Sequence, residues 1–122
     1  MKAKLEDLPQ VRPELGDAVR GSDWGEMASG LMTFPKGMDF CPLLEGLENN
    51  LCQCPHWGYM MTGQVKVTYS DGRTETVCGG EMYYWPPGHT ILLEEDSQYV
   101  EFSPKEQMAD VLAHVVSKMS PG

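Results

Sequence analysis

The segment 64–77 constrains the fold most strongly, because its residues alternate between apolar and polar side chains around a turn. Val65 and Val67 stand two positions apart, which places them on the same face of a β-strand. Asp71 and Gly72 follow, and this pair favours a two-residue turn in which both positions need positive φ. We therefore expect an antiparallel β-hairpin in this part of the chain.

A similar pattern of short apolar runs and turn residues extends over most of the chain. Its 122 residues are the length of one domain. From residue 24 onward, short apolar runs alternate with Gly, Pro, Asn and Asp, a spacing typical of all-β barrels and sandwiches. Further strands are expected near residues 26–34, 38–44, 51–54, 56–62, 81–85, 90–94 and 98–102. Residues 1–23 precede them as an N-terminal arm, in which 13–20 forms a short helix with Pro13 in its first turn.

After Phe102 the apolar period becomes helical. Ser103 and Glu106 have the spacing of a capping box, with Pro104 between them at a position where its missing N–H costs nothing. The apolar stripe that follows consists of Met108, Val111, Leu112, Val115 and Met119. Residues 105–122 are therefore expected to be a C-terminal α-helix that packs on the barrel or on a partner subunit. His114 lies off this stripe and is expected in solvent.

Charge excludes some classes of partner. The chain has 18 acidic and 9 basic residues and a net charge of -9, so its surface repels phosphate backbones and no nucleic-acid partner is expected. No apolar run is long enough to span a membrane. The N-terminus becomes acidic at once and has no apolar stretch of a secretory signal, which predicts a cytoplasmic protein. The four cysteines are accordingly expected as thiols or metal ligands rather than disulfides.

Three candidate metal ligands alternate in the stretch 52–63. Cys52, Cys54 and His56 stand two positions apart, so on a strand all three would face the same way and could bind a soft metal through two thiolates and one imidazole. Pro55 removes a backbone donor, which predicts an edge strand or a bent one. Buried cysteines that merely fill a core are the alternative interpretation.

The stretch 80–89 holds the next candidate. Its Pro-Pro-Gly run at 86–88 predicts a turn, and His89 follows it directly. His89 is interpreted either as an inward-facing ligand or as a turn histidine that bonds the backbone. Aromatic side chains at Tyr59, Tyr84 and Trp85 are candidates for the wall of a ligand pocket, with plain core packing as the alternative.

These two stretches resemble the paired motifs of the cupins, which are small antiparallel jelly-roll barrels. Gly80, Pro86 and Gly88 match the second cupin motif at its spacing, and the apolar run that ends at Gly63 resembles the close of the first motif. Counting back from Gly63, His56 occupies the position of the family's glutamate. The resemblance covers residues 24–104 and implies a single-domain cupin β-barrel there.

The chain also departs from the family's motifs. The His-x-His pair of the first motif is absent, and its positions fall either on Leu43 and Glu45 or on Asn50 and Cys52. In the second motif, Ile91 stands where the family has histidine and Glu95 where it has asparagine. His89 lies two residues before Ile91, on the same face of a strand, and can supply an imidazole from that shifted position.

The resemblance implies one divalent metal ion, such as Fe, Zn, Ni or Mn, near the barrel mouth. Its expected ligands are His56, His89 and Glu101, the last being the one charged residue in an otherwise apolar strand, with Cys52 and Cys54 as further candidates. If Glu101 faces outward instead, its two neighbours in the strand fill the interior.

Three functions stay open on these observations. The first is a metal-binding cupin, of the dioxygenase or isomerase type if it is an enzyme, that acts on or binds a small polar molecule. The second is a non-catalytic ligand-binding or sensor cupin that has lost the usual metal triad, and the third is a structural zinc site at Cys52, Cys54 and His56. Cupins often form homodimers, and the N-terminal arm and C-terminal helix are the expected contacts. The fold itself does not decide the chemistry.

Overall fold

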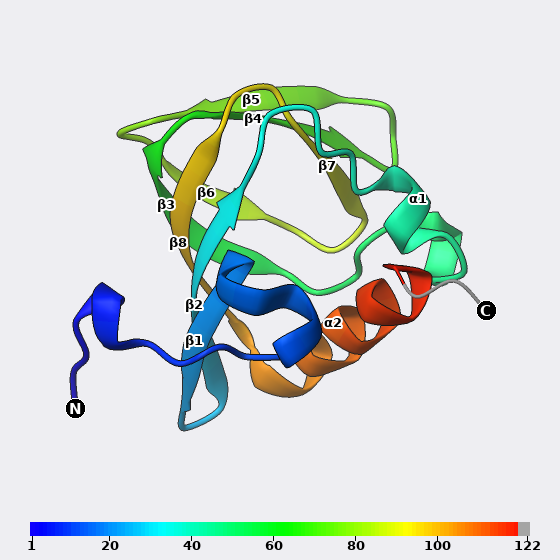
Figure 1. Ribbon diagram of the computed structural model, residues 1–122. Coiled ribbons are helices and arrows are strands. Elements are labelled where there is room, and N and C mark those ends of the chain that lie inside the picture. The colour runs from blue at the N-terminus through cyan, green and yellow to red at the C-terminus, as the bar shows by residue number, and fades with distance from the viewer. Residues whose placement is uncertain (120–122) are drawn as a thin grey trace.

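A computed structural model describes residues 1–119 and shows two antiparallel β-sheets packed face to face, with a helix across one end of the sandwich (Figure 1). The larger sheet has five strands in the order β1-β2-β8-β3-β6, and the smaller has three in the order β5-β4-β7. The strands are β1 Val19–Trp24, β2 Met27–Phe34, β3 His56–Thr62, β4 Gln64–Tyr69, β5 Thr74–Cys78, β6 Met82–Trp85, β7 His89–Leu93 and β8 Ser97–Pro104. The expected all-β jelly roll is therefore confirmed.

The hairpin that motivated this expectation is formed by β4 and β5. Val65 pairs with Val77 across it, and Val65 and Val67 are fully buried between the sheets. The loop is longer than a two-residue turn, and only Gly72 has a positive φ, of 88°. Asp71 keeps an ordinary φ, and its carboxylate accepts hydrogen bonds from the amide and the guanidinium of Arg73 across the loop.

The interior of the sandwich is filled by large side chains from both sheets. Trp85, Tyr99, Met60 and Leu93 are almost completely inaccessible to solvent. Burial of this apolar area, at about 25 cal/mol per Å², is the main source of stability for the fold. One end of the core is less apolar, because histidine, cysteine and glutamate side chains gather there.

A C-terminal helix, α2 Lys105–Met119, closes that end (Figure 1). Met108, Leu112 and Val115 are buried as their spacing predicts, whereas Met119 is exposed. The last three residues of the segment 105–122 lie outside the described part of the chain. The short helical segments are η1 Leu5–Asp7, η2 Pro13–Ala18, α1 Cys41–Leu44 and η3 Glu48–Asn50. Within residues 1–119, no helix has the length and apolar character needed to cross a membrane.

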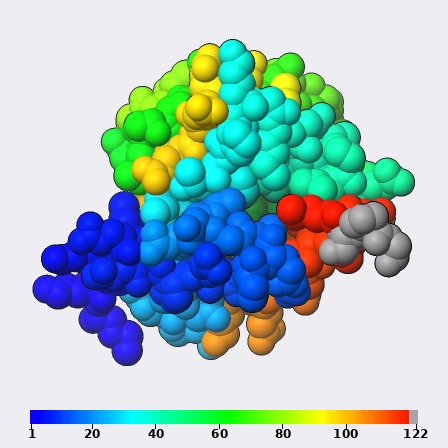
Figure 2. Space-filling view, viewed as in Figure 1, coloured from blue at the N-terminus to red at the C-terminus, as the bar shows by residue number. Residues whose placement is uncertain are grey.

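The N-terminal arm is shorter than expected. Its helical turn is a 3-10 segment that ends at Ala18, and residues 19–23, expected in the arm, form most of β1. The reason is that Gly21 allows β1 to approach β2 closely, since a Cβ at Gly21 would overlap the backbone carbonyl of Ser29. Residues before this strand lie along its free edge, where Gln10 bridges to Arg20, and cover part of the molecular surface (Figure 2).

Two expected strands are not regular strands. In the segment 38–44, a single bridge joins Asp39 to Leu92, and the rest forms α1, in which Pro42 lies in the first turn. In the segment 51–54, a single bridge joins Cys52 to His89. Both segments therefore run beside β7 and contact it at single bridges, without adding a regular strand to the smaller sheet.

Candidate functional site

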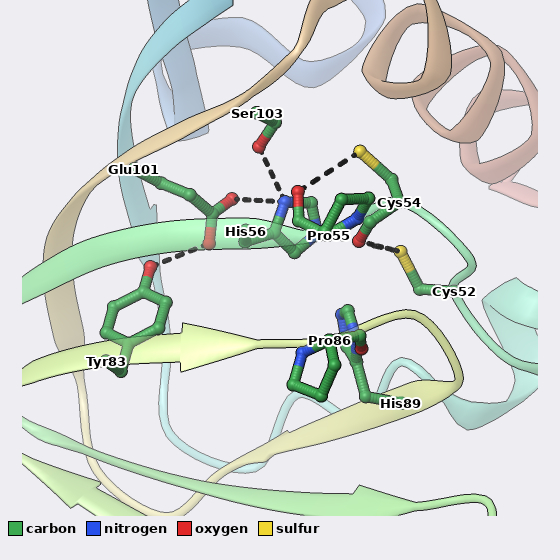
Figure 3. A network of polar contacts seen from close by, with 9 residues as sticks. All are labelled: Cys52, Cys54, Pro55, His56, Tyr83, Pro86, His89, Glu101 and Ser103. Atoms are coloured by element: carbon green, nitrogen blue, oxygen red, sulfur yellow. Dashed lines mark hydrogen bonds and ion pairs between the residues drawn. The ribbon is translucent and has the colours of Figure 1, made fainter.

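Cys52, His56 and His89 meet in the interior, at the end of the sandwich near α2 (Figure 3). One ligand atom from each lies within 4.8 Å of the other two, and all three side chains are buried. The ring centroids of His56 and His89 are 5.1 Å apart. The fold thus brings together imidazoles that are 33 positions apart in the sequence.

Backbone pairing explains how the three residues come together. His56 begins β3 and pairs with Trp85 on β6, while His89 begins β7 after the turn at Gly88, whose φ is 91°. Cys52 is tied to this turn because its amide donates to the carbonyl of His89 at 2.8 Å. The proline and glycine of the second motif therefore shape the turn that sets His89 beside Cys52.

The imidazole of His56 is held from both sides. Its Nδ1 lies 2.6 Å from Ser103 Oγ and 3.5 Å from a carboxylate oxygen of Glu101, while its Nε2 lies 3.6 Å from Cys52 Sγ (Figure 3). The neighbouring carboxylate favours a proton on Nδ1, which leaves the lone pair on Nε2 directed toward the thiol. This orientation is the one that a metal-binding histidine needs.

The tautomer of His89 follows from its backbone contact. Its Nδ1 lies 2.7 Å from the carbonyl oxygen of Pro86, and because a carbonyl only accepts, Nδ1 must donate. Nε2 of the neutral ring therefore carries a free lone pair. Burial lowers the pKa of His56 to about 3 and that of His89 to about 4, so both rings are neutral at pH 7. Neutral imidazole is the form that binds metals.

The third member of the cluster is a protonated thiol. Burial raises the pKa of Cys52 to about 12, so the thiol keeps its proton at neutral pH unless a cation replaces it. An ion with bonds of about 2.0–2.3 Å holds neighbouring ligand atoms roughly 3.5 Å apart. Cys52 Sγ and His56 Nε2 are already close to that separation. One thiolate and two imidazoles suit Zn²⁺ and similar divalent ions, so this donor set can hold a metal.

Glu101 faces the interior, and its neighbour Phe102 is exposed. Its carboxylate accepts a hydrogen bond of 2.6 Å from the Tyr83 hydroxyl, and burial raises its pKa to about 7. It approaches His56 at Nδ1, whereas Cys52 approaches at Nε2. Glu101 therefore stands behind His56 and outside the three-residue cluster, which differs from the ligand set expected from the sequence.

Cys54 is buried near the cluster but does not belong to it. Its Sγ lies 3.5 Å from the carbonyl oxygen of Pro55, and burial raises its pKa to about 12. The segment before β3 is not a regular strand, so the two-residue alternation that would align Cys54 with Cys52 and His56 does not bring the three groups together. The set proposed for a structural zinc site is thus not assembled.

Ser103 has a different role from the one its capping-box spacing predicts. Strand β8 runs through Ser103, whose hydroxyl contacts His56 instead of capping α2. The sequence does not predict this contact if the strand is taken to end at Phe102, whereas β8 continues to Pro104. The available signal was the two-residue period, which places Ser103 on the same face as Glu101 once the strand is extended.

A small cavity of about 60 Å³ adjoins the cluster. Trp85 lines it, and its indole N–H is buried without a hydrogen-bond partner among the described residues. Tyr59 and Tyr84, the other two aromatic residues expected in the pocket, are 42% and 49% exposed and lie on the outer face of the sheet. The reason is strand alternation, since each is an odd number of positions from its inward-facing neighbour His56 or Trp85. Four apolar residues of α2 complete the wall of the cavity: Met108, Val111, Leu112 and Val115.

A second, larger space of about 230 Å³ lies under the N-terminal segment, between β1, β2 and α2. Glu101 lines both this cleft and the inner cavity, and Ser103 lines the cleft. The side of His56 that carries its hydrogen-bond partners therefore faces the cleft, while the side that carries the lone pair faces the inner cavity.

A jelly roll with ligand-type side chains gathered inside one end defines the cupin fold, and comparison with solved structures agrees. An RmlC-like cupin from Shewanella frigidimarina is similar with a TM-score of 0.55 and 15% identity, over 84% of this chain and 88% of that one. The EutQ protein of Clostridium difficile is similar with a TM-score of 0.55 and 18% identity, over 93% of this chain and 82% of that one.

A variant of oxalate decarboxylase from Bacillus subtilis is also similar, with a TM-score of 0.54 and 21% identity over 85% of this chain. This chain spans only 29% of that longer protein. No family model and no curated protein matches the sequence. At these identities the likeness establishes the cupin fold and leaves the chemistry to be argued from the site.

Proposed function

We propose that this protein is a metal-binding cupin that holds one divalent ion between Cys52, His56 and His89 and takes a small polar molecule beside it. The observation that carries the proposal is the convergence of three buried donors of the right chemistry on one point. Iron, zinc, nickel and manganese are the candidate ions, and the thiolate favours the softer ones.

A bound ion would supply a Lewis acid, or an oxygen-activating centre if it is iron. The residues around it have separate tasks. Ser103 and Glu101 fix the ring of His56, and the Pro86 carbonyl fixes that of His89, so both lone pairs are oriented in advance. Glu101, held by Tyr83, also stands between the cluster and the cleft, where it can accept or return a proton.

The size and polarity of the inner cavity restrict the small molecule. A space of about 60 Å³ admits only a few non-hydrogen atoms. Trp85 lines the cavity and its indole can only donate, so a ligand with an acceptor atom that reached the unpaired N–H would satisfy it. Leaving such a donor unpaired costs about 1–3 kcal/mol, which a ligand oxygen would recover. A small molecule with an acceptor oxygen, such as a short carboxylate, fits both requirements.

Metal content tests the first half of the proposal. The protein is purified without a histidine tag, and its metals are measured by mass spectrometry for wild type and for His56→Ala, His89→Ala and His114→Ala. His114 is the matched control, because it lies on α2 with Nε2 2.8 Å from the Glu45 carbonyl, away from the cluster. We expect near-stoichiometric metal in wild type and in the control and a loss in the other two variants. Equal loading in all four proteins would refute the metal site.

The second half is tested with formate as the probe. The indole N–H resonance of Trp85 is followed by NMR while formate is added to the metal-loaded protein, and it is assigned by its absence in Trp85→Phe. We expect this resonance to shift and that of the exposed Trp57 to stay in place. A metal-free protein in which the Trp85 resonance still responds would favour the non-catalytic ligand-binding alternative, and no response in the loaded protein would exclude a small carboxylate.

A further inference from the structure

A row of glycines crosses the inner face of the larger sheet on both sides of Glu101. Strand register places five residues directly opposite one another, in the order Gly21 on β1, Gly30 on β2, Glu101 on β8, Gly58 on β3 and Tyr83 on β6. Residues that stand opposite each other in neighbouring strands point to the same face of the sheet. Glu101 is therefore the charged side chain of this row, with a glycine on each side of it.

The two sides of Glu101 are filled differently. Toward β6, the ring of Tyr83 lies over Gly58, and its hydroxyl donates to the carboxylate at 2.6 Å. Toward β1, Gly30 and Gly21 have no side chains, and they line the cleft of about 230 Å³ together with Glu101. Since neighbouring strands lie about 4.8 Å apart, this strip of uncovered backbone extends roughly 10 Å from Glu101 to β1.

The fold does not require glycine at position 30. Gly30 has no positive φ, and the one close contact of a Cβ there would be the terminal methyl group of Met32 at 2.8 Å, which can rotate away. Gly21 differs, since a Cβ there would overlap the backbone carbonyl of Ser29. Glycine inside a strand weakens it, and it often marks a position where a ligand approaches the backbone closely. Gly30 therefore favours a ligand in the cleft.

The charge of the cleft indicates the class of ligand. Glu101 and Asp23 line it, and none of the described residues in its lining is basic. Glu101 is only 5% exposed, whereas Asp23 is exposed on the edge strand β1. The guanidinium of Arg20, also on β1, is engaged elsewhere, because it donates to the backbone carbonyls of Glu6 and Leu8. A buried carboxylate that a cleft reaches, with no cation in the cleft lining, favours a positively charged ligand.

The rest of the cleft suits a short apolar chain. Met108 and Leu112 of α2 line it, together with Val11 of the N-terminal segment. A cavity of about 150 Å³ holds benzene, so a cleft of about 230 Å³ admits a molecule of up to roughly nine non-hydrogen atoms. A ligand of this size can reach Glu101 with a charged group while its apolar part stays against the side chains of α2.

We propose that the cleft is a binding site for a small organic cation, namely a primary amine with a short apolar chain. Its ammonium group approaches Glu101 from the side of Gly30 and donates to the carboxylate, and its chain lies along the uncovered backbone. Asp23 attracts the cation at the mouth of the cleft. The site is distinct from the metal cluster, because Glu101 approaches His56 at Nδ1 and Cys52 approaches it at Nε2.

Titration of the metal-free protein with n-butylammonium chloride tests the site, and its result does not depend on the metal cluster. Binding is followed at pH 8 through the NMR resonances of the Gly21, Ala28 and Gly30 backbone amides. We expect saturable shifts with a Kd on the order of 1 mM. Butanol, which has the same chain without the charge, and butyrate should bind at least about tenfold more weakly. Equal affinity for all three would overturn the cationic ligand, and the absence of saturable shifts would overturn the site.

Two variants test where the cation binds. Glu101→Gln keeps the shape of the side chain and removes its charge, so it should weaken n-butylammonium binding at least about tenfold. Gly30→Val fills the floor of the cleft and should abolish binding although Glu101 is retained. Asp110→Asn is the matched control, because Asp110 is an exposed acid of α2 outside the cleft lining, and its affinity should equal that of wild type. Circular dichroism shows whether each variant is folded. A folded Glu101→Gln or Gly30→Val that binds like wild type would refute the proposal, as would a control that binds as weakly as Glu101→Gln.

Discussion

Metal binding at the cluster should release one proton from Cys52 for each ion. With a pKa of about 12, this thiol is ionised in about one molecule in ten thousand at pH 8. Forming the thiolate at that pH therefore costs roughly 5 kcal/mol, which the bond to the ion must offset. His56 and His89 are already neutral at pH 8, so they release nothing. The apparent affinity should rise about tenfold for each pH unit between pH 7.5 and 9.

Calorimetry with Zn²⁺ in two buffers of different ionisation enthalpy measures the number of protons released. We expect about one proton for wild type and about none for Cys52→Ser, whose binding should also be much weaker. Cys54→Ser is the matched control, since Cys54 has an equally raised pKa and lies outside the cluster. A wild type that binds zinc without releasing a proton, or a control that behaves like Cys52→Ser, would refute this account of the site.

Three further outcomes follow from the packing of the site. Ser103→Ala should lower the free energy of unfolding by about 1–2 kcal/mol in urea, because it removes the partner of a buried ring nitrogen; an unchanged midpoint would show that this contact is not formed. The depressed pKa of His89 means that the metal-free protein loses stability as pH falls from about 6.5 to about 4, where the unfolded chain binds the proton first. Urea titrations at several pH values measure the free energy of unfolding. Over this pH range it should fall by on the order of 1 kcal/mol per pH unit more for wild type than for His89→Asn, and parallel plots of the two free energies against pH would contradict this. Gly58→Ala should cost about 1–3 kcal/mol, since the added methyl would overlap the ring of Tyr83, and a thermal midpoint equal to that of wild type would speak against such tight packing.

Much of the fold could be predicted from local patterns, because two-residue and helical periods dictate which side chains are buried. The hairpin of β4 and β5 and the helix α2 are examples. The segment 38–44 could not be predicted in this way, because its apolar residues suit a strand as well as a helix. The contact of Phe40 with β7, where its amide donates to the Ile91 carbonyl, is a tertiary interaction that no local pattern shows.

The candidate site was predictable in its histidines and less so in its other members. His56 and His89 belong to motifs whose glycines and prolines shape recognisable turns. The side chains of Cys54 and Glu101 are placed by their contacts with the Pro55 carbonyl and the Tyr83 hydroxyl. The sequence pattern does not show these contacts. The two-residue period of a β-strand indicates which face of the sheet a side chain occupies. It does not indicate which neighbouring group that side chain contacts.

Strands β3, β6 and β8 present unlike chemistry on their two surfaces, with His56 next to Trp57 and Glu101 next to Phe102. A deletion of a single residue in β3 would shift the part of the strand on one side of the deletion by one position and exchange its two surfaces there. Where the shifted part includes His56 and Trp57, the imidazole would face water and the indole would enter the polar pocket, so one deletion would destroy both features at once. This part of the chain should therefore tolerate substitutions far better than changes in length.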